Sequence, residues 1–300
     1  MLDTGPLRAI IPAIQPMPRG PHGPRRLFAY PRQTVRLLSL DFWLYMTNGT
    51  ISTSYHIFDG HWQSVDGEVI EEALVSIHVN GQELATIAAT PIQQDRLAVG
   101  FLANEGLITS KDEMRAVHIC PNGSCVDVWL THDIEPPRKP ILTSGCGGGV
   151  TFDDLSRAQL PLDSDTQLPA DQLWSLQEHL QNAARLYRRT RGVHTSALFL
   201  GATLVSSGED VGRHNTLDKI RGDCLLRGVD TRGGILLSTG RISSEMLNKA
   251  AKMGCPIVAS RTSATSLSVQ LARAWNMTLV GYLRRGKMLV YTNGWRLRLA

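Results

Sequence analysis

The second half of the chain alternates between short apolar stretches and amphipathic stretches, and this alternation restricts the fold more than any other feature. Strands are predicted at residues 196–200, 235–239, 256–260 and 278–283. Helical patterns begin between them near Asn215, Ser244 and Ser266, and residues 171–191 have the pattern of one long amphipathic helix. This alternation predicts an α/β fold in which strands and helices form layers.

A small α+β unit is predicted to precede this region, within residues 56–142. Its strands are expected at residues 74–79, 84–89, 117–120 and 126–130. A tight turn at Asn80-Gly81 joins the first two strands. Thr90-Pro91 is typical of a helix start with proline in the first helical position, and Gly106 is typical of its end. The buried stripe of this helix is expected to consist of Leu97, Phe101 and Leu102.

Residues 1–55 contain seven prolines and are expected to form a disordered, basic leader. They hold six arginines against two acidic residues. The leader is either a targeting segment or an upstream extension, with translation starting at Met17 or Met46. Its low serine content favours the extension.

The charge of the remaining chain is balanced. Removing six arginines and two acids from the 31 basic and 27 acidic residues of the chain leaves 25 of each sign. A nucleic-acid-binding domain would carry a net basic face, so nucleic acid is not an expected partner. No apolar run approaches the roughly 20 residues of a membrane-spanning helix, so no membrane is expected either. Five cysteines and no visible secretory signal favour a reducing, cytoplasmic setting without a disulfide framework.

Three predicted strand-to-helix junctions have the same polar character. They lie at residues 209–215, 238–244 and 260–266, and contain Arg213, Arg241 and Arg261. Small polar residues at free helix starts suit phosphate, although any single junction is more often an ordinary helix cap. A hairpin tip, Arg284-Arg285-Gly286-Lys287, adds three cations. Four such loops at one sheet edge would favour a nucleotide ligand. The P-loop and GxGxxG patterns are absent, which argues against the usual use of ATP, GTP or NAD.

The cysteines fall into three groups. Cys224 and Cys255 lie in apolar patterns typical of a core. Cys120 and Cys125 bracket a Pro-Asn-Gly turn like half of a zinc knuckle, but the other half is missing, so no metal site is expected. Cys146 lies among four glycines in a loop, residues 143–155, that we expect to be mobile. This setting suits a group-accepting thiolate, and by residue type an incidental loop cysteine is an equal alternative.

A zinc deaminase site is excluded by its missing residues. His194 could be taken for the start of such a site, but Ser196 stands where the glutamate is required and no PCxxC follows.

Several segments together resemble the FdhD family, in order from about residue 68 to residue 292. They are LVSIHVNG at 74–81, TP at 90–91, LAVGFLANEG at 97–106, SGCG at 144–147, EDVGRHNTLDK at 209–219, LVGY at 279–282 and YT at 291–292. The EDVGRHN segment is the most specific of them.

This resemblance implies a sulfurtransferase that serves formate dehydrogenase. Family members take sulfur from a cysteine desulfurase as a cysteine persulfide. They pass it to the molybdenum or tungsten bis(molybdopterin guanine dinucleotide) cofactor. The resemblance also implies a homodimer, and a C-terminal domain at residues 156–300 that is like cytidine deaminase without its zinc.

The resemblance assigns roles to particular residues. Cys146 would hold the persulfide. The cofactor site would be lined by Tyr282, Leu283, Arg284, Arg285, Gly286 and Lys287. Arg213, His214 and Arg241 are further candidate contacts, for which a buried structural role is an equal alternative.

One departure from the family leaves two functions open. Many members carry Cys-x-x-Cys in the loop, and here Gly149 occupies the second position. A single cysteine can still carry sulfur, so a sulfur-transferring enzyme remains one reading. The alternative is a chaperone that binds the cofactor and transfers no sulfur. Only the first predicts that Cys146→Ser abolishes maturation of formate dehydrogenase.

Overall fold

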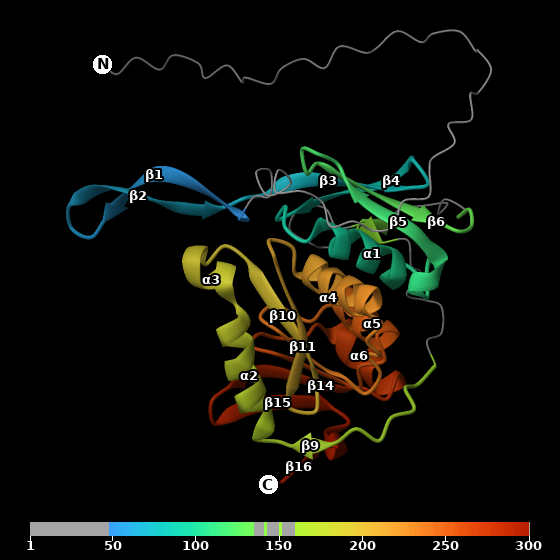
Figure 1. The fold of residues 1–300 in the computed structure, drawn as a ribbon. Helices are drawn as coiled ribbons and strands as arrows, with labels where there is room; N and C mark the ends of the chain where they lie inside the picture. The colour runs from blue at the N-terminus through green and yellow to red at the C-terminus, as the bar shows by residue number, and fades with distance from the viewer. Residues whose placement is uncertain (1–47, 135–140, 143–149, 152–159, 300) are drawn as a thin grey trace. The chain divides into compact units, whose positions relative to one another are not determined.

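The structure is a computed structural model that describes residues 48–134, 141–142, 150–151 and 160–299 (Figure 1). Contacts between Cα atoms divide the chain into residues 1–40 and 41–300. The first unit and most of the expected leader lie outside the described residues. Cys146 and Gly149 lie outside them as well.

The described chain begins with a hairpin of β1 (Thr50–Phe58) and β2 (Trp62–Ile70). Every residue of the two strands is exposed or half-buried, including Trp62 at 71%. Assigning residues 50–55 to a disordered leader is therefore wrong. No strand signal is present in these residues because neither face of the hairpin is buried, so no apolar alternation is required.

A four-stranded sheet follows, in the order β4-β3-β6-β5. Its strands are β3 (Ala73–Val79), β4 (Gln82–Ala89), β5 (Met114–Ile119) and β6 (Cys125–Leu130). Helix α1 (Gln94–Asn104) packs on it, and the predicted stripe of Leu97, Phe101 and Leu102 is buried. The 3-10 turn η2 (Lys111–Glu113) leads into β5.

Helix α1 begins later than the sequence predicts. Pro91 does not occupy its first position, because residues 91–93 form a bend in which the Ile92 N–H donates to the Thr90 carbonyl at 2.8 Å. Gln93, with φ at 55°, separates this bend from the helix. The end is as predicted, at Glu105 and Gly106.

The large sheet has six strands in the order β11-β10-β12-β13-β14-β15, and it confirms the α/β prediction. The strands are β10 (His194–Leu200), β11 (Thr203–Asp210), β12 (Ile235–Ser238), β13 (Ile257–Ser260), β14 (Thr278–Arg284) and β15 (Lys287–Thr292). Only the pairs β12–β13 and β13–β14 are parallel. Strand β10 runs antiparallel to β12, which brings its first residue beside the last residues of the parallel strands.

Helices cover both faces of this sheet (Figure 1). One face is covered by α4 (Arg213–Arg227), α5 (Ser244–Lys252) and α6 (Ser266–Ala274), which pack on Leu198, Leu236, Val258 and Leu279. The other face is covered by α2 (Gln172–Ala183), which packs on the alternate residues of the same strands. Short pairs, β7 (Ile141–Leu142) with β8 (Val150–Thr151) and β9 (Leu168–Pro169) with β16 (Leu297–Arg298), complete the described strands, and the 3-10 turn η3 (Gly294–Arg296) precedes β16. None of the helices among the described residues has both the length and the apolar character that a membrane span requires.

The single helix expected at residues 171–191 is divided in two. Helix α2 ends at Ala183, and α3 (Arg185–Thr190) follows after Ala184, whose ψ of 74° is not helical. The cause comes from a distant strand. The carboxylate of Glu209 in β11 accepts hydrogen bonds from the N–H groups of Leu186 and Tyr187, both at 2.9 Å. These two hydrogen bonds replace the ones that the same N–H groups would form inside a continuous helix.

Helices α1 and α4 touch through their backbones at two glycines. A Cβ added to Gly100 would lie 1.7 Å from the Asp218 carbonyl oxygen. A Cβ added to Gly222 would lie 1.9 Å from the Arg96 carbonyl oxygen. The small α+β unit and the large sheet are thus joined by a helix contact that excludes any side chain.

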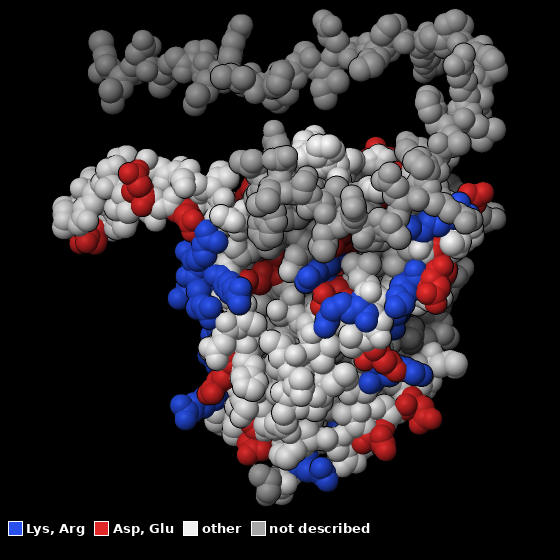
Figure 2. Space-filling view, in the orientation of Figure 1, with Lys and Arg blue, Asp and Glu red and all other residues white. Residues whose placement is uncertain are grey.

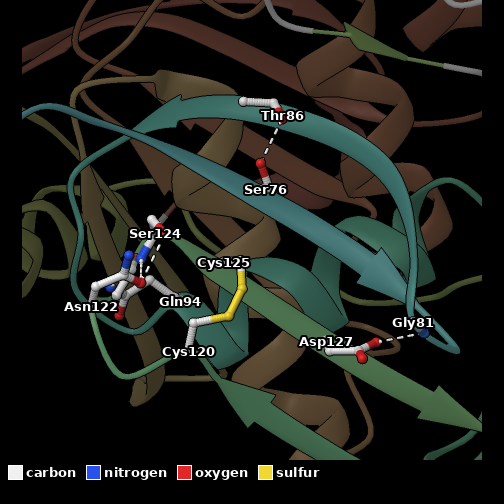
Figure 3. The surroundings of a disulfide bond; sticks show 10 residues. Ser76, Gly81, Thr86, Gln94, Cys120, Asn122, Ser124, Cys125 and Asp127 are labelled. Atoms are coloured by element: carbon white, nitrogen blue, oxygen red, sulfur yellow. Dashed lines mark hydrogen bonds between the residues drawn. A yellow bond between two sulfur atoms is a disulfide. The ribbon is translucent and has the colours of Figure 1, made fainter. Parts of the chain in front are cut away.

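Cys120 and Cys125 form a disulfide across the turn between β5 and β6 (Figure 3). The expectation of reduced cysteines is therefore wrong for this pair. The two residues flank a tight turn that is also closed by backbone hydrogen bonds, from Cys120 N–H to Cys125 O at 2.9 Å and from Gly123 N–H to Cys120 O at 2.8 Å. The tight turn itself brings the two sulfur atoms together, so this bridge does not require a framework of several disulfides.

Candidate functional site

A cleft of about 410 Å³ opens at the carboxyl ends of the parallel strands of the large sheet. It is lined by Tyr187, Arg191, Gly192, Val193, His194, Val211, Thr239, Arg261, Thr262 and Arg284. Each of the three predicted junctions and the β14–β15 hairpin contributes at least one of these residues. The four loops thus converge on one sheet edge, which is the condition under which the sequence favours a nucleotide ligand, at the position where open α/β sheets bind ligands.

The cleft is positively charged. Arg191, Arg261 and Arg284 are exposed and line it, and its lining contains no acidic residue. Among the described carboxylates, none forms an ion pair with these three guanidinium groups. Arg191 also lies over the ring of Tyr187, with its Cζ 5.0 Å from the ring centre. Guanidinium groups without carboxylate partners are suited to binding phosphate.

The hydroxyl groups of the junctions hold the loops in place. Ser238 Oγ lies 3.0 Å from Ser196 Oγ and accepts the Gly240 N–H at 3.2 Å. Ser260 Oγ donates to the Gly240 carbonyl at 2.7 Å, and Thr239 Oγ1 accepts the Thr195 N–H at 3.0 Å. The small polar residues therefore fix the shape of the cleft, while its arginines supply the charge.

The predicted cofactor contacts are only partly brought to the cleft. Arg284 lines it, and Arg285, Gly286 and Lys287 are exposed on the adjoining hairpin. Tyr282 is exposed, with φ at 49°, next to an irregularity in the β14–β15 pairing. Leu283 differs from the others: it is 1% exposed and belongs to the core beneath α2, so its side chain cannot line a cofactor site.

Among the weaker candidates, His214 is buried beneath the cleft-forming loops. Its Nε2 lies 3.1 Å from Ser243 Oγ and 3.2 Å from a carboxylate oxygen of Glu245. Burial, followed by the charges of Lys249 and Arg213, lowers the pKa of His214 to about 2, so its ring is neutral. These contacts favour a structural role for His214.

Arg213 and Arg241 lie outside the cleft lining. Arg213 is 5% exposed, whereas Arg241 is exposed. Both are close enough to His194 for their charges to lower its pKa. They therefore contribute to the potential near the cleft without forming its wall.

The most specific motif of the sequence, residues 209–219, is largely buried framework. Asp210 and Lys219 form an ion pair at 2.7 Å with both side chains fully buried. The other Asp210 oxygen accepts the Gly212 N–H and the Asn215 Nδ2, both at 2.8 Å. Lys219 also donates to the Thr90 carbonyl at 3.1 Å. These bonds tie the end of β4 to β11 and α4.

A second buried ion pair of the motif joins three helices. Lys249 of α5 donates to both carboxylate oxygens of Asp218 in α4, at 2.6 and 2.8 Å. Asn104 of α1 donates to the same carboxylate at 2.7 Å. A sequence signal for these structural roles exists. Asp218, Lys219 and Lys249 are charged, yet they occupy positions that the helix pattern assigns to a buried face.

The described cysteines other than the disulfide pair are unsuited to carrying sulfur. Cys224 and Cys255 are fully buried, as predicted. Burial raises the pKa of Cys224 to about 11 and that of Cys255 to about 12. Because the thiolate is the reactive form, both remain inert thiols at neutral pH.

The lining residues that sequence reasoning missed include Arg191 and His194. Both precede or begin β10, whose antiparallel pairing with β12 brings them to the cleft. A larger hollow of about 790 Å³ borders α2, α3 and β11. Two of its three Arg and Glu side chains already have partners: Glu209 caps α3, and Arg189 pairs with Glu68 at 2.6 Å. Figure 2 shows Lys and Arg side chains gathered over α3.

Comparisons with known proteins agree on one family. The model of the FdhD/NarQ family matches residues 70–298. The sulfur carrier protein FdhD of Staphylococcus aureus strain MRSA252 is 35% identical over 242 residues, which cover 78% of this chain and 91% of that protein. The protein of the same name from strain bovine RF122 / ET3-1 has the same identity and coverage.

One solved structure has the same fold. It is the crystal structure of a protein from Desulfotalea psychrophila that is assigned as a formate dehydrogenase accessory protein. It matches with a TM-score of 0.72 and 28% identity, covering 83% of this chain and 100% of that chain.

Proposed function

Because the chain belongs to the FdhD/NarQ family, we propose that it is a sulfur carrier required for the activity of a formate dehydrogenase. Its relatives in Staphylococcus aureus bear the name of a sulfur carrier, and its solved relative is assigned as a formate dehydrogenase accessory protein. The sulfur comes from a cysteine desulfurase and passes to a molybdenum or tungsten bis(molybdopterin guanine dinucleotide) cofactor, which is the cargo of this protein.

The observation that carries this proposal is the cluster of Arg191, Arg261 and Arg284 around one cleft. Two guanine dinucleotides carry several phosphates, and guanidinium groups bind phosphate through paired N–H donors. The exposed Arg285 and Lys287 add charge at the hairpin beside the cleft. Basic and acidic residues are equal in number outside residues 1–55. Cations without carboxylate partners nevertheless lie together at this one edge of the sheet.

Cys146 is the residue proposed to carry the sulfur. Its thiolate attacks the outer sulfur of the desulfurase persulfide, a new S–S bond forms, and the desulfurase cysteine leaves as a thiolate. This exchange needs no oxidant or reductant. The described cysteines support the choice by elimination, because two are buried and two are paired.

The protein is further proposed to act in the cytoplasm as a homodimer. Its partners in this scheme are the desulfurase that supplies sulfur and the formate dehydrogenase that receives the finished cofactor.

A second function, binding of the cofactor without transfer of sulfur, is favoured by one observation. Gly149 replaces the second cysteine that many family members carry. The two functions differ in a single experiment, in which a strain lacking the native gene is complemented with wild-type or Cys146→Ser protein. Loss of formate dehydrogenase activity with Cys146→Ser supports sulfur transfer, and full activity supports the binding function.

Mass measurement tests the sulfur step directly. Wild-type protein is incubated with a cysteine desulfurase and cysteine, and its intact mass is recorded. A gain of one sulfur atom that is absent from Cys146→Ser is the expected result. A gain that persists in Cys146→Ser would assign the persulfide to another cysteine.

Binding of GDP tests the cleft. We expect Arg261→Ala and Arg284→Ala each to weaken GDP binding by about tenfold, because each removes a charge-assisted hydrogen bond donor. The matched control is Arg273→Ala, an exposed arginine on α6 away from the cleft lining. Equal losses in all three variants would show that only the overall charge matters.

A further inference from the structure

His194 is the only histidine that lines the cleft in the described part of the chain. It is the first residue of β10 and is half-buried. Its Nδ1 would lie 3.3 Å from a Cβ added to Gly240, and the same Cβ would lie 3.0 Å from Arg213 Cβ. The ring thus packs in the space that Gly240 leaves open, beside Arg213, at the wall of the cleft.

The charged groups that act on the pKa of His194 lie on α4, on β11 and in the loop after β12. Arg213 begins α4, and Arg241 follows β12. Both lower the pKa of His194, after the larger effect of burial, and Asp210 acts in the opposite direction. The Asp210 carboxylate, which is paired with Lys219 at 2.7 Å, offsets the effect of the two arginines only in part. His214, the remaining titratable group beside it, is neutral.

The same cleft places three more cations near this ring. Arg191, Arg261 and Arg284 line the cleft together with His194. No described residue is hydrogen-bonded to the imidazole in the structure, and the ring forms part of the cleft wall. Burial and the nearby arginines thus favour the neutral ring, and an anion placed among the cleft arginines would oppose the electrostatic part of this effect by attracting the protonated ring.

We propose that His194 takes up one proton from solvent when phosphate groups enter the cleft, and that the resulting imidazolium binds the phosphate together with the cleft arginines. The inference deepens the proposed function and rests on it, since the phosphates are those of a guanine dinucleotide. It makes His194 a contact whose charge appears only with the ligand. Affinity then rises as the pH falls, over the interval between the pKa values of the free and the bound protein, by at most tenfold per pH unit.

The probe for this test is P1,P2-di(guanosine-5′) diphosphate. Each of its phosphorus atoms carries one ester and one anhydride bond, so neither has the second ionisation near pH 6 that the terminal phosphate of GDP shows. Any proton exchanged near neutral pH then belongs to the protein. Titration calorimetry of the full chain is performed in two buffers that differ in ionisation enthalpy, at several values between about pH 5.5 and 8.

For the wild-type chain we expect uptake of up to one proton per bound probe, and at least fivefold tighter binding at pH 6 than at pH 8. His194→Gln should bind at pH 8 within about threefold of wild type, with no proton uptake and an affinity that does not change with pH. The matched control is His118→Gln, an exposed residue of β5. It should retain the wild-type proton uptake.

The outcomes distinguish a failure of the role of His194 from a failure of the proposed nucleotide site. Binding by the wild type without proton uptake overturns the role of His194 and leaves the proposed nucleotide site intact, and this result needs no variant. Proton uptake that survives in His194→Gln assigns the proton to another group and also overturns the inference. Absence of binding at every pH overturns the nucleotide site and the inference together. Circular dichroism of each variant ensures that an unfolded chain is not scored as a loss of binding.

Discussion

Lys219 illustrates how single residues determine the stability of this molecule. Its ammonium group is fully buried, with one carboxylate and two backbone carbonyls as acceptors. Such a charge is tolerated in a core only because every proton has an acceptor and the Asp210 partner is fixed in turn.

We therefore expect Lys219→Met to lower the free energy of unfolding by about 3–5 kcal/mol, because it leaves the Asp210 carboxylate buried without a counter-charge. Urea denaturation followed by circular dichroism measures this loss. Lys111→Met, at an exposed position of η2, is the control and should change stability by less than about 0.5 kcal/mol. A loss below about 1 kcal/mol for Lys219→Met would mean that water or a local shift replaces the lysine.

The buried thiols give a second prediction for single residues. Cys224 and Cys255, with pKa values of about 11 and 12, hold about one thiolate per thousand molecules or fewer at pH 8. After reduction, we expect iodoacetamide to alkylate Cys120 and Cys125 in the native chain, and Cys224 and Cys255 only after unfolding in denaturant. Peptide mapping by mass spectrometry measures the labelling. Rapid native labelling of Cys255 would contradict its burial.

At the level of single elements, the turn between β5 and β6 does not depend on its disulfide alone. Backbone hydrogen bonds close the turn, and the Ser76 N–H of β3 donates to the Ser124 carbonyl at 2.9 Å. The Gln94 side chain adds a bond to the Gly123 carbonyl at 3.3 Å (Figure 3).

Reduction of Cys120–Cys125 should consequently cost about 2 kcal/mol of unfolding free energy, as expected for a loop of six residues, without loss of the sheet. Denaturation with and without dithiothreitol measures the difference. The double variant Cys120→Ser/Cys125→Ser should match the reduced chain and be insensitive to dithiothreitol. A collapse of the β-sheet signal on reduction would show that the bridge, and not the backbone bonding, maintains the turn.

The elements that the sequence predicts well are those whose pattern follows from their own burial. Strands β3, β6, β10, β12, β13 and β14 are apolar because they are buried, and their positions agree with the prediction. The break between α2 and α3 could not be predicted, because its cause is the Glu209 carboxylate from β11. The hairpin β1–β2 could not be predicted either, since exposed strands need no apolar face.

The same distinction holds for the candidate site. The loops after β12 and β13 could be predicted as neighbours, because the carboxyl ends of parallel strands meet at one sheet edge. Arg191 and His194 belong to a segment whose place depends on the strand order β11-β10-β12, which local pattern does not determine. The role of Cys146 and the likeness to cytidine deaminase remain predictions from the family resemblance.

At the level of the whole molecule, the small sheet with α1 and the large sheet belong to one compact unit. The sequence predicts two domains, because each has its own strands and its own apolar core. The contact between α1 and α4 joins them, and α4 also contributes Leu225 and Leu226 to the core of the small sheet.

We therefore expect a fragment of residues 160–300 not to fold by itself. Without α1, the Asp218 carboxylate would lose its bond from Asn104, and the glycine surface of α4 would face water. A fragment of residues 48–300 serves as the folded control, and the measurements are circular dichroism and cooperative denaturation. Cooperative unfolding of the shorter fragment would show that the large sheet is an independent domain.

The glycine contact between α1 and α4 also affects the rate at which a ligand binds in the cleft. A hinge motion of the small sheet against the large sheet would separate the touching backbones of α1 and α4. It would also expose two buried ion pairs to water. We therefore do not expect the two sheets to close around a ligand. Ligand binding then depends on diffusion into an open, positively charged cleft. Its association rate constant should fall steeply as ionic strength rises, while the dissociation rate constant should change much less.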